Sequence, residues 1–182
     1  MLVGSSDPFK SVWRQRHAMT LAEPDLVCEV AGHADLPAVE ACWWRLLMDQ
    51  QEHDFRGDLD DLKTLHNVDR VRRFLESRVR QSRLAVARRD GQLAGICTFA
   101  PDHFILDTSV AVWDVSDVYI EPHLRRQGIA KALVAFAEHE CRMRGAQEIR
   151  LTVYSTNEAA LNLYQDLGYT PVSHVFSKRI ED

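Results

Sequence analysis

The chain has 182 residues, and 46% of them are hydrophobic, which is enough apolar material for one globular domain with a sizeable core. Its 22 basic and 27 acidic residues give a net charge of −5 at pH 7, so we expect no nucleic-acid partner. No apolar run approaches the roughly 18 residues of a membrane span. The first residues also lack the apolar stretch of a signal peptide, so we expect a cytoplasmic protein with no membrane partner.

The four cysteines are far apart, form no C-x-x-C pair and fall within apolar runs. We interpret them as reduced core residues rather than as disulfides or metal ligands. No histidine pair has the spacing of H-E-x-x-H or of another metal motif, so we expect no metal.

Residues 1–24 mix Gly, Ser, Pro and charged residues, and we interpret them as an N-terminal extension to a single domain at residues 25–182. The apolar run Leu26–Val30 predicts a first strand. From Leu36 to Met48, apolar residues recur at helical spacing and predict an amphipathic helix that faces a sheet.

An acidic stretch around Gly57 follows, and its composition predicts a loop. Residues from Val68 to Val79 again show helical spacing. The outer face of this helix carries five arginines, which we interpret as a solvated face rather than a binding patch because Asp69 and Glu76 partly neutralise them. These arginines are Arg70, Arg72, Arg73, Arg78 and Arg80.

Two short strands, 84–87 and 93–99, flank Asp90-Gly91, a dipeptide that favours a tight hairpin turn. The run from Val110 to Ile120 is rich in strand formers and predicts a long central strand, which Pro122 ends. A helix with an apolar stripe then extends from about Gly128 to Met143.

The last three predicted elements are a strand at Ile149–Tyr154, a helix at Glu158–Leu167 and a strand at Pro171–Ile180. Strands and helices therefore alternate along most of the chain. This order indicates an α/β fold in which helices cover a mixed sheet.

The segment from Arg125 to Ala130 joins the central strand to the following helix. The first turn of a helix has unpaired N–H groups and a partial positive charge, so this junction can bind a pyrophosphate. Gly128 permits close approach of the backbone, and Arg125, Arg126 and Lys131 add positive charge. The alternative is a plain helix start with solvated arginines. Neither the P-loop pattern nor G-x-G-x-x-G occurs, which argues against nucleotide hydrolysis and nicotinamide chemistry.

This junction resembles motif A of the GNAT superfamily of acyl-CoA-dependent N-acetyltransferases, whose pattern is Q/R-x-x-G-x-G/A. Leu151–Tyr169 resembles motif B, in which a strand and an Asn precede a helix that reads A-x-x-L/F-Y-x-x-x-G-F/Y. The resemblance implies a mixed, mostly antiparallel sheet of six to seven strands with a splayed central strand pair and about four flanking helices. It also implies acetyl-CoA as the co-substrate.

The resemblance further implies where the cofactor binds. A bulge in the central strand would free backbone groups for the pantetheine arm, and the N–H of Val118 would polarise the thioester carbonyl. Asn157 corresponds to a residue that bonds the cofactor arm, although it also suits a helix N-cap. The cofactor-binding residues implied in this way are Val118, Tyr119, Ile120, Arg125, Arg126, Gln127, Gly128, Ile129, Ala130, Lys131, Asn157 and Tyr164.

For catalysis, Tyr164 corresponds to the family tyrosine that protonates the leaving CoA thiolate; the alternative is a packed aromatic residue. Asp117 is the first candidate for the general base, Asp114 the second, and Glu121 and His123 are weaker. A structural role for Asp117 stays open. Because no Cys-His or Ser-His arrangement indicates an acyl-enzyme, we expect direct attack of the amine on the thioester in a ternary complex.

The expected acceptor is a primary amine, either of a small molecule or of a peptide or protein. Its site would be formed by 43–57 and 102–108, where an acidic set of side chains can attract a cationic amine or simply be solvated. That set is Glu52, Asp54, Asp58 and Asp61. Another hypothesis is a non-catalytic acyl-CoA sensor, and a third is an interaction module that uses the arginine-rich helix. The identity of the amine and the choice between monomer and homodimer stay open.

Overall fold

The computed structural model of the chain describes residues 25–51, 65–102, 110–176 and 178, and the chain divides into two compact units after Leu151. The expected N-terminal extension and the acidic residues between 52 and 64 lie outside the described residues, as does most of the loop 102–108. In the described residues, the first unit contains the sheet and three α-helices, and the second contains a fourth α-helix.

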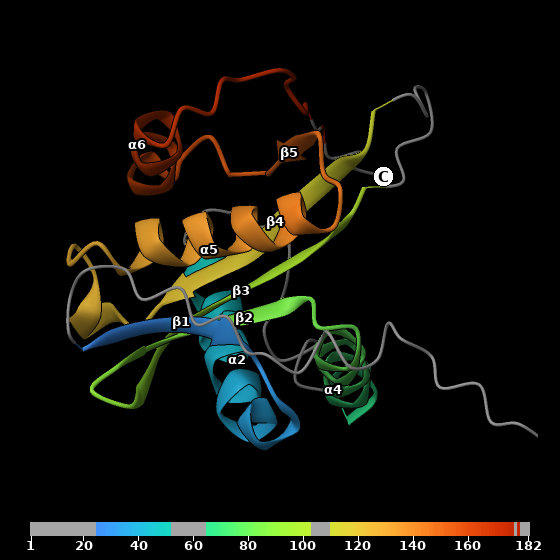
Figure 1. Cartoon of the computed structure of the whole chain (residues 1–182), viewed down its shortest axis with the longest axis vertical. Coiled ribbons are helices and arrows are strands. Elements are labelled where there is room, and N and C mark those ends of the chain that lie inside the picture. The colour runs from blue at the N-terminus through green and yellow to red at the C-terminus, as the bar shows by residue number, and fades with distance from the viewer. Residues whose placement is uncertain (1–24, 52–64, 103–109, 177, 179–182) are drawn as a thin grey trace, which may run out of the picture. The chain divides into compact units, whose positions relative to one another are not determined.

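The described strands form one mixed sheet in the order β1-β2-β3-β4-β5 (Figure 1). The first four strands are antiparallel to their neighbours, and β5 joins β4 in parallel. The predicted mixed, mostly antiparallel sheet is therefore confirmed, with five strands instead of six to seven. The strands are β1 Leu26–Val30, β2 Leu84–Arg89, β3 Gln92–Pro101, β4 Val112–Ile120 and β5 Glu148–Arg150.

The strand count differs from the prediction near the C-terminus. β5 ends at Arg150 instead of Tyr154, and its partners are only Val112 to Asp114 of β4. In the predicted strand Pro171–Ile180, the described residues 171–176 are not a strand. Val172 and Phe176 there are 78% and 92% exposed, and the described part of the second unit offers no strand with which they can pair.

The four predicted α-helices are present. They are α2 Leu36–Gln51, α4 Leu65–Arg80, α5 Ile129–Met143 and α6 Glu158–Asp166, and two short 3₁₀ turns, η1 His33–Asp35 and η2 Pro122–Leu124, complete the described helices. Within the first unit, α5 covers one face of the sheet, and α2 and α4 lie on the other (Figure 1). We call these the α5 face and the α2/α4 face.

Because both faces of the sheet are covered, its central strands are buried on both sides. Leu84, Ala85, Val86 and Ala87 of β2 are all fully buried, with Ala85 and Ala87 on the α5 face and the other two on the α2/α4 face. A continuous apolar run is typical of strands in this position. All four cysteines are buried and free, as predicted for core residues.

The hairpin between β2 and β3 confirms the predicted turn. Asp90 and Gly91 have φ angles of 51° and 76°, and Arg89 pairs with Gln92 across the turn. Positive φ at both central residues matches the right-handed twist of the two strands. The chain thus reverses tightly between Arg89 and Gln92, and the register of the two strands shifts farther from the turn, between Ala87 and Arg88.

Two possible features are not seen in the described residues. No helix there combines the length and the apolar character that crossing a membrane requires. Among the same residues, no three His, Cys, Asp or Glu side chains gather closely enough to hold a metal ion.

Strands β3 and β4 approach closely at Gly95. A Cβ at this position would lie 2.5 Å from the carbonyl oxygen of Tyr119 and 2.4 Å from Cδ1 of Ile120. A backbone oxygen cannot turn aside as a long side chain can. Because Gly95 has no side chain, β3 can approach the C-terminal half of β4 closely enough to pair with it.

We expect Gly95→Ala to lower the free energy of unfolding by about 1–3 kcal/mol, because the added methyl group must push β4 away from β3. Urea unfolding followed by circular dichroism measures the change. Gly32→Ala is the matched control, since the nearest atom to its Cβ is Asp35 Oδ2 at 3.7 Å. An equal loss in both variants would contradict the steric explanation.

Candidate functional site

A bulge interrupts β4 at Asp117 and Val118. Ser116 pairs with Thr98, and Tyr119 pairs with Ile96, so two residues of β4 lie opposite the single residue Cys97 of β3. Asp117 has a φ of 53°, in the left-handed region that residues other than glycine seldom adopt. The bulge implied by the family resemblance is therefore present.

The two edges of β4 differ in their pairing beyond Asp114. Up to Asp114, the strand pairs with β5; beyond it, the edge of β4 that faces β5 has no strand partner in the described sheet. On the opposite edge, Tyr119 and Ile120 are again paired with β3. Among the residues predicted to offer free backbone groups, Val118 is the one that lies in the bulge itself.

Gly128 is the N-cap of helix α5, and its φ of 78° and ψ of −5° are left-handed. Arg126 is also left-handed, with a φ of 64°. Within the described residues, the N–H groups from 126 to 131 have no backbone acceptor. Apart from Gly128 itself and its two chain neighbours, nothing in the described residues lies within 4 Å of the position of a Cβ on Gly128. The start of α5 therefore presents open space lined by N–H donors, which suits an anion.

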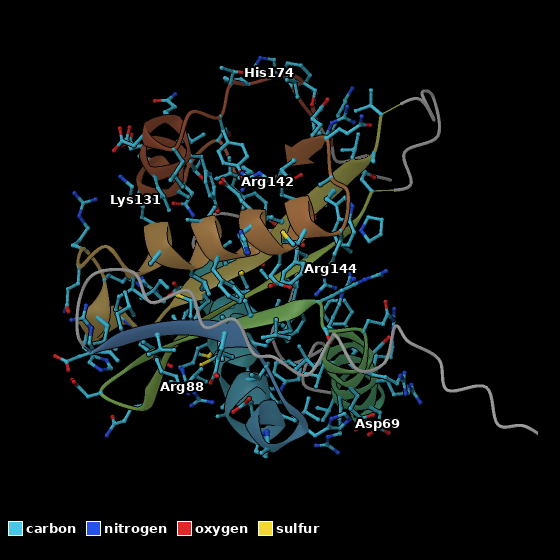
Figure 2. All side chains as sticks on the ribbon, viewed as in Figure 1. Asp69, Arg88, Lys131, Arg142, Arg144 and His174 are labelled. Atoms are coloured by element: carbon cyan, nitrogen blue, oxygen red, sulfur yellow. The ribbon has the colours of Figure 1, made fainter. Side chains whose placement is uncertain are left out.

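The side chains at this junction have different surroundings. Arg126, Gln127 and Lys131 are exposed, and Figure 2 shows Lys131 near the start of α5. Ile129 is 1% exposed and belongs to the core of the α5 face, so only its backbone is available to a ligand. Ala130 packs against the same core.

Arg125 is engaged within the protein. Its Nε donates to the carbonyl oxygen of Ile120 at 3.0 Å, and its Nη2 forms an ion pair with Asp49 of α2. The guanidinium also lies over the ring of Tyr119, 5.6 Å from the ring centre. Arg125 thus ties the loop before α5 to the end of β4 and to α2, and its predicted contact with a cofactor stays a prediction.

Asp117 lies on the α2/α4 face, where Thr98 Oγ1 donates to its Oδ2 at 2.6 Å. Burial raises the pKa of the Asp117 carboxyl above its ordinary value, and the Thr98 hydrogen bond and the charge of Arg78 offset part of this rise. The indole of Trp43 lies on the same side, close enough to lower the pKa of Asp117 as a donor, although its buried Nε1 makes no hydrogen bond of ordinary geometry in the described residues.

The other base candidates differ from Asp117 in their surroundings. Burial also raises the pKa of Asp114, and a hydrogen bond from Ser116 offsets part of the rise. Burial acts in the same direction on Glu121, but hydrogen bonds from Cys42 and Arg45 outweigh it, so the pKa of Glu121 is lowered. Glu121 and His123 line a separate pocket of about 520 Å³ beside the β2–β3 turn.

The structure corrects one interpretation of the arginine-rich helix. Arg78 is half-buried, its guanidinium lies 4.8 Å from the ring centre of Phe74, and burial lowers its pKa while the charge of Asp117 opposes that shift. The other four arginines of α4 are exposed, and Arg72 pairs with Glu40. Helical periodicity places Arg78 among the polar positions but cannot indicate that the half-buried carboxylate of Asp117 lies near it.

Thr98 and Arg78 are the site residues that sequence analysis missed. Threonine is common in strands, and Thr98 stands in the apolar run of β3 without any motif of its own. Its partner Asp117 is 19 positions away along the chain. Only the pairing register of β3 and β4 brings the two side chains together.

In the second unit, Asn157 and Tyr164 belong to α6. Asn157 is the N-cap of α6, where its Oδ1 accepts from the N–H of Ala160 at 3.1 Å. Tyr164 is buried, and its ring contacts Tyr169 edge-on with 5.9 Å between ring centres. Both structural alternatives considered for these residues are therefore present, and their roles toward the cofactor stay predictions.

A sequence model of the acetyltransferase (GNAT) family matches residues 43–169, which is more than half of the chain. The matched region contains the bulged strand, the Gly128 junction and α6. The chain therefore belongs to the acetyltransferase (GNAT) family, as its two motifs predict.

Three similar proteins illustrate this membership. Aminoglycoside N(6')-acetyltransferase type 1 of Klebsiella aerogenes is 40% identical over 57 residues, which cover 31% of this chain and 38% of that protein. The [ribosomal protein bS18]-alanine N-acetyltransferase of Escherichia coli K12 is 30% identical over 74 residues, which cover 41% of this chain and 47% of that protein. The chain thus spans less than half of the length of these two relatives.

The third similar protein is a solved structure. It is a predicted acetyltransferase from Clostridium acetobutylicum with acetyl-CoA, and it superimposes with a TM-score of 0.66 over 85% of this chain and 96% of its own. Its sequence identity is 16%, so the similarity concerns the fold.

Since the pKa of Asp117 is raised in the folded protein, the folded state binds a proton at this site more tightly than the unfolded chain does. The ionised carboxylate therefore costs stability, and this cost grows as the pH rises from the ordinary aspartate pKa of about 3.9 towards neutrality. We expect Asp117→Asn to have a higher Tm than the wild type at pH 7, with the difference shrinking towards pH 4. Thermal unfolding at several pH values measures this.

Asp69→Asn is the matched control, because it removes the same charge from an exposed position on α4 (Figure 2). Its Tm difference from the wild type should be small and should vary little with pH. A Tm of Asp117→Asn that lies below the wild type at every pH would show that the carboxylate stabilises the fold.

Proposed function

We propose that the chain is an N-acetyltransferase that moves an acetyl group from acetyl-CoA to a primary amine. The observation that carries this proposal is the junction at Gly128, where a left-handed glycine and unpaired N–H groups face open space directly after a bulged strand. The junction falls inside the region matched by the acetyltransferase (GNAT) family. A similar fold has been solved with acetyl-CoA, which supports the choice of co-substrate.

The start of α5 is the proposed site for the pyrophosphate of CoA. Its N–H groups would donate to the phosphate oxygens, and the helix dipole favours negative charge there. The absence of a Cβ at Gly128 leaves room for the phosphate. Arg126, Gln127 and Lys131 are exposed beside this site and would contribute charge and polar contacts.

The edge of β4 beyond Asp114 is the proposed site for the pantetheine arm. The amides of the pantetheine arm resemble a peptide backbone and can pair with an open strand edge. The bulge frees the backbone of Val118, whose N–H would donate to the thioester oxygen as negative charge develops there. Among the residues assigned to the arm, Asn157 already caps α6 through its side chain.

The reaction consists of one acetyl transfer and the proton movements that accompany it. The acceptor ammonium gives a proton to Asp117, directly or through water, and the free amine attacks the thioester carbonyl. A C–N bond forms and the C–S bond breaks. The CoA thiolate takes a proton from Tyr164, which recovers one from solvent. The new amide nitrogen releases its extra proton to solvent, and so does Asp117, so the net reaction releases one proton. The raised pKa of Asp117 favours this role, because a stronger base accepts the proton more readily near neutral pH.

The cysteines support direct transfer rather than an acyl-enzyme. Burial raises the pKa of Cys28 and Cys42 to about 11 and that of Cys141 to about 12, and it raises the pKa of Cys97 as well. A thiol attacks as its thiolate, so none of these side chains is an effective nucleophile near pH 7.

The proposed acceptor class is a primary amine of a small molecule, a peptide or a protein. The two curated relatives differ in this respect, since one is named for an aminoglycoside and the other for the alanine of a ribosomal protein. Trp43 lies near Asp117 and also packs against the core of the α2/α4 face.

We expect Gly128→Glu to weaken CoA binding at least about a hundredfold, because it places bulk and negative charge where the pyrophosphate is proposed to bind. Isothermal titration with CoA measures the affinity. Gly128→Ala is the matched control, since both variants strain the left-handed backbone equally but only glutamate adds charge. If the two variants bind CoA equally well, the pyrophosphate does not bind at this junction.

The activity is tested by thiol release from acetyl-CoA with a panel of amines that includes an aminoglycoside, a polyamine and a peptide with an N-terminal alanine. We expect turnover with at least one of them. With that amine, Tyr164→Phe should lower kcat roughly tenfold to a hundredfold and leave the Kd for CoA nearly unchanged, because it removes a proton donor but keeps the packed ring.

Two outcomes would contradict these assignments. Tight binding of CoA without turnover of any amine would favour the non-catalytic sensor over the transferase. An unchanged kcat in Tyr164→Phe would remove Tyr164 from the reaction while leaving the transferase activity intact.

A further inference from the structure

The buried side of the bulge contains a hydroxyl group that the reaction described above does not use. Thr98 of β3 is 0% exposed and is the one buried polar side chain among the described residues. Its neighbours Cys97 and Phe99 belong to the α5 face, so the Thr98 side chain points to the α2/α4 face, as strand alternation requires. A buried hydroxyl is costly unless it forms a hydrogen bond.

The hydroxyl of Thr98 makes one short hydrogen bond. Oγ1 lies 2.6 Å from Oδ2 of Asp117, compared with 3.3 Å from Oγ of Ser116 and 3.5 Å from its carbonyl oxygen. Because a hydroxyl has a single proton, the shortest contact identifies the acceptor as Asp117. A hydrogen bond to a charged acceptor is also the strongest of these options.

The charged and titratable groups around Asp117 come from several elements. Arg78 of α4 attracts the carboxylate, Asp114 of β4 repels it, and the buried thiol of Cys97 lies on β3 behind it. Trp43 of α2 is the remaining neighbour on this face. Thr98 and Trp43 both act on Asp117 as hydrogen-bond donors, and Thr98 makes the short hydrogen bond, at 2.6 Å.

The backbone at Asp117 has a conformation that depends on its surroundings. A left-handed residue other than glycine costs on the order of 1–3 kcal/mol and persists only when its surroundings hold it. The bulge also removes Asp117 from the regular ladder. Its side chain is therefore oriented by its own contacts, and the Thr98 hydrogen bond is the shortest of them.

We propose that Thr98 is a positioning residue, whose hydroxyl fixes the orientation of Asp117 and keeps it ionised so that it can accept the proton of the amine. This role rests on the proposed function in one respect, namely that Asp117 is the general base. Thr98 itself touches neither substrate nor reacting atoms. Its effect reaches the reaction only through the carboxylate.

The test compares Thr98→Val, which keeps the branched shape but removes the hydroxyl, with Thr98→Ser, which keeps the hydroxyl. Without the donor, the pKa of Asp117 rises, so the acid limb of the kcat/KM profile should move to higher pH in Thr98→Val. At pH 7, kcat/KM should fall at least about tenfold, as expected for the loss of a hydrogen bond to a charged group. The KM for acetyl-CoA should stay unchanged.

Thr98→Ser should restore both the profile and the rate to within about threefold of the wild type, since the donor is present again. Ser116→Ala is a further control that changes the neighbouring hydroxyl but leaves the shortest contact of Asp117 in place. An acid limb and a rate that are the same in Thr98→Val as in the wild type would overturn the proposal.

A second measurement separates this proposal from the proposed function. NMR titration of the Asp117 carboxyl carbon in the protein without substrates reports its ionisation directly. A higher titration midpoint in Thr98→Val supports the role of Thr98, whatever the activity of Asp117→Asn. Full activity in Asp117→Asn would show separately that Asp117 is not the base. An unchanged midpoint overturns the proposal whatever the activity of Asp117→Asn.

If Thr98→Val does not fold, the wild-type protein still provides a test. A hydroxyl proton held in a short buried hydrogen bond exchanges slowly with water and gives its own resonance. A Thr98 hydroxyl resonance with a nuclear Overhauser effect to the β-protons of Asp117 supports the proposal. Rapid exchange of that proton with solvent overturns it.

Discussion

The extra residue in β4 determines how the two faces of the sheet are used. Before the bulge, Trp113 and Val115 lie on the α5 face; after it, Val118 and Ile120 do. A regular strand would alternate by twos and would therefore place residue 117 on that same face. The bulge inserts one residue and turns Asp117 to the α2/α4 face instead. The Asp117 carboxylate and the start of α5 therefore lie on opposite faces of the sheet.

This separation has an electrostatic advantage. An anion at the start of α5 and an ionised carboxylate on the same face would repel each other through a medium of low dielectric constant. With the sheet between them, the unpaired N–H groups favour negative charge on one side, and Thr98 and Arg78 stabilise a carboxylate on the other.

Local patterns in the sequence were sufficient to predict the helices, the hairpin turn and part of the site. Helical spacing predicted α2, α4 and α5, and Asp90-Gly91 predicted a turn whose φ angles confirm it. The helix start at Gly128 and the N-cap at Asn157 depend on neighbouring residues and were predicted as well.

Pairings between distant segments could not be predicted in the same way. A strand requires a partner, so the apolar residues after Pro171 predicted a strand that the described residues do not form. The contact of Thr98 with Asp117 and the burial of Arg78 depend on the register of β3 against β4 and on the packing of α4. The apolar spacing in β4 does contain a signal of the bulge, because the step from Val115 to Val118 is three residues instead of two.

The buried cysteines have a practical consequence. Since none of them presents a reactive thiolate, a cysteine introduced at an exposed position such as Lys131 would be labelled selectively. A fluorescent or spin probe can therefore be attached without first removing the natural cysteines.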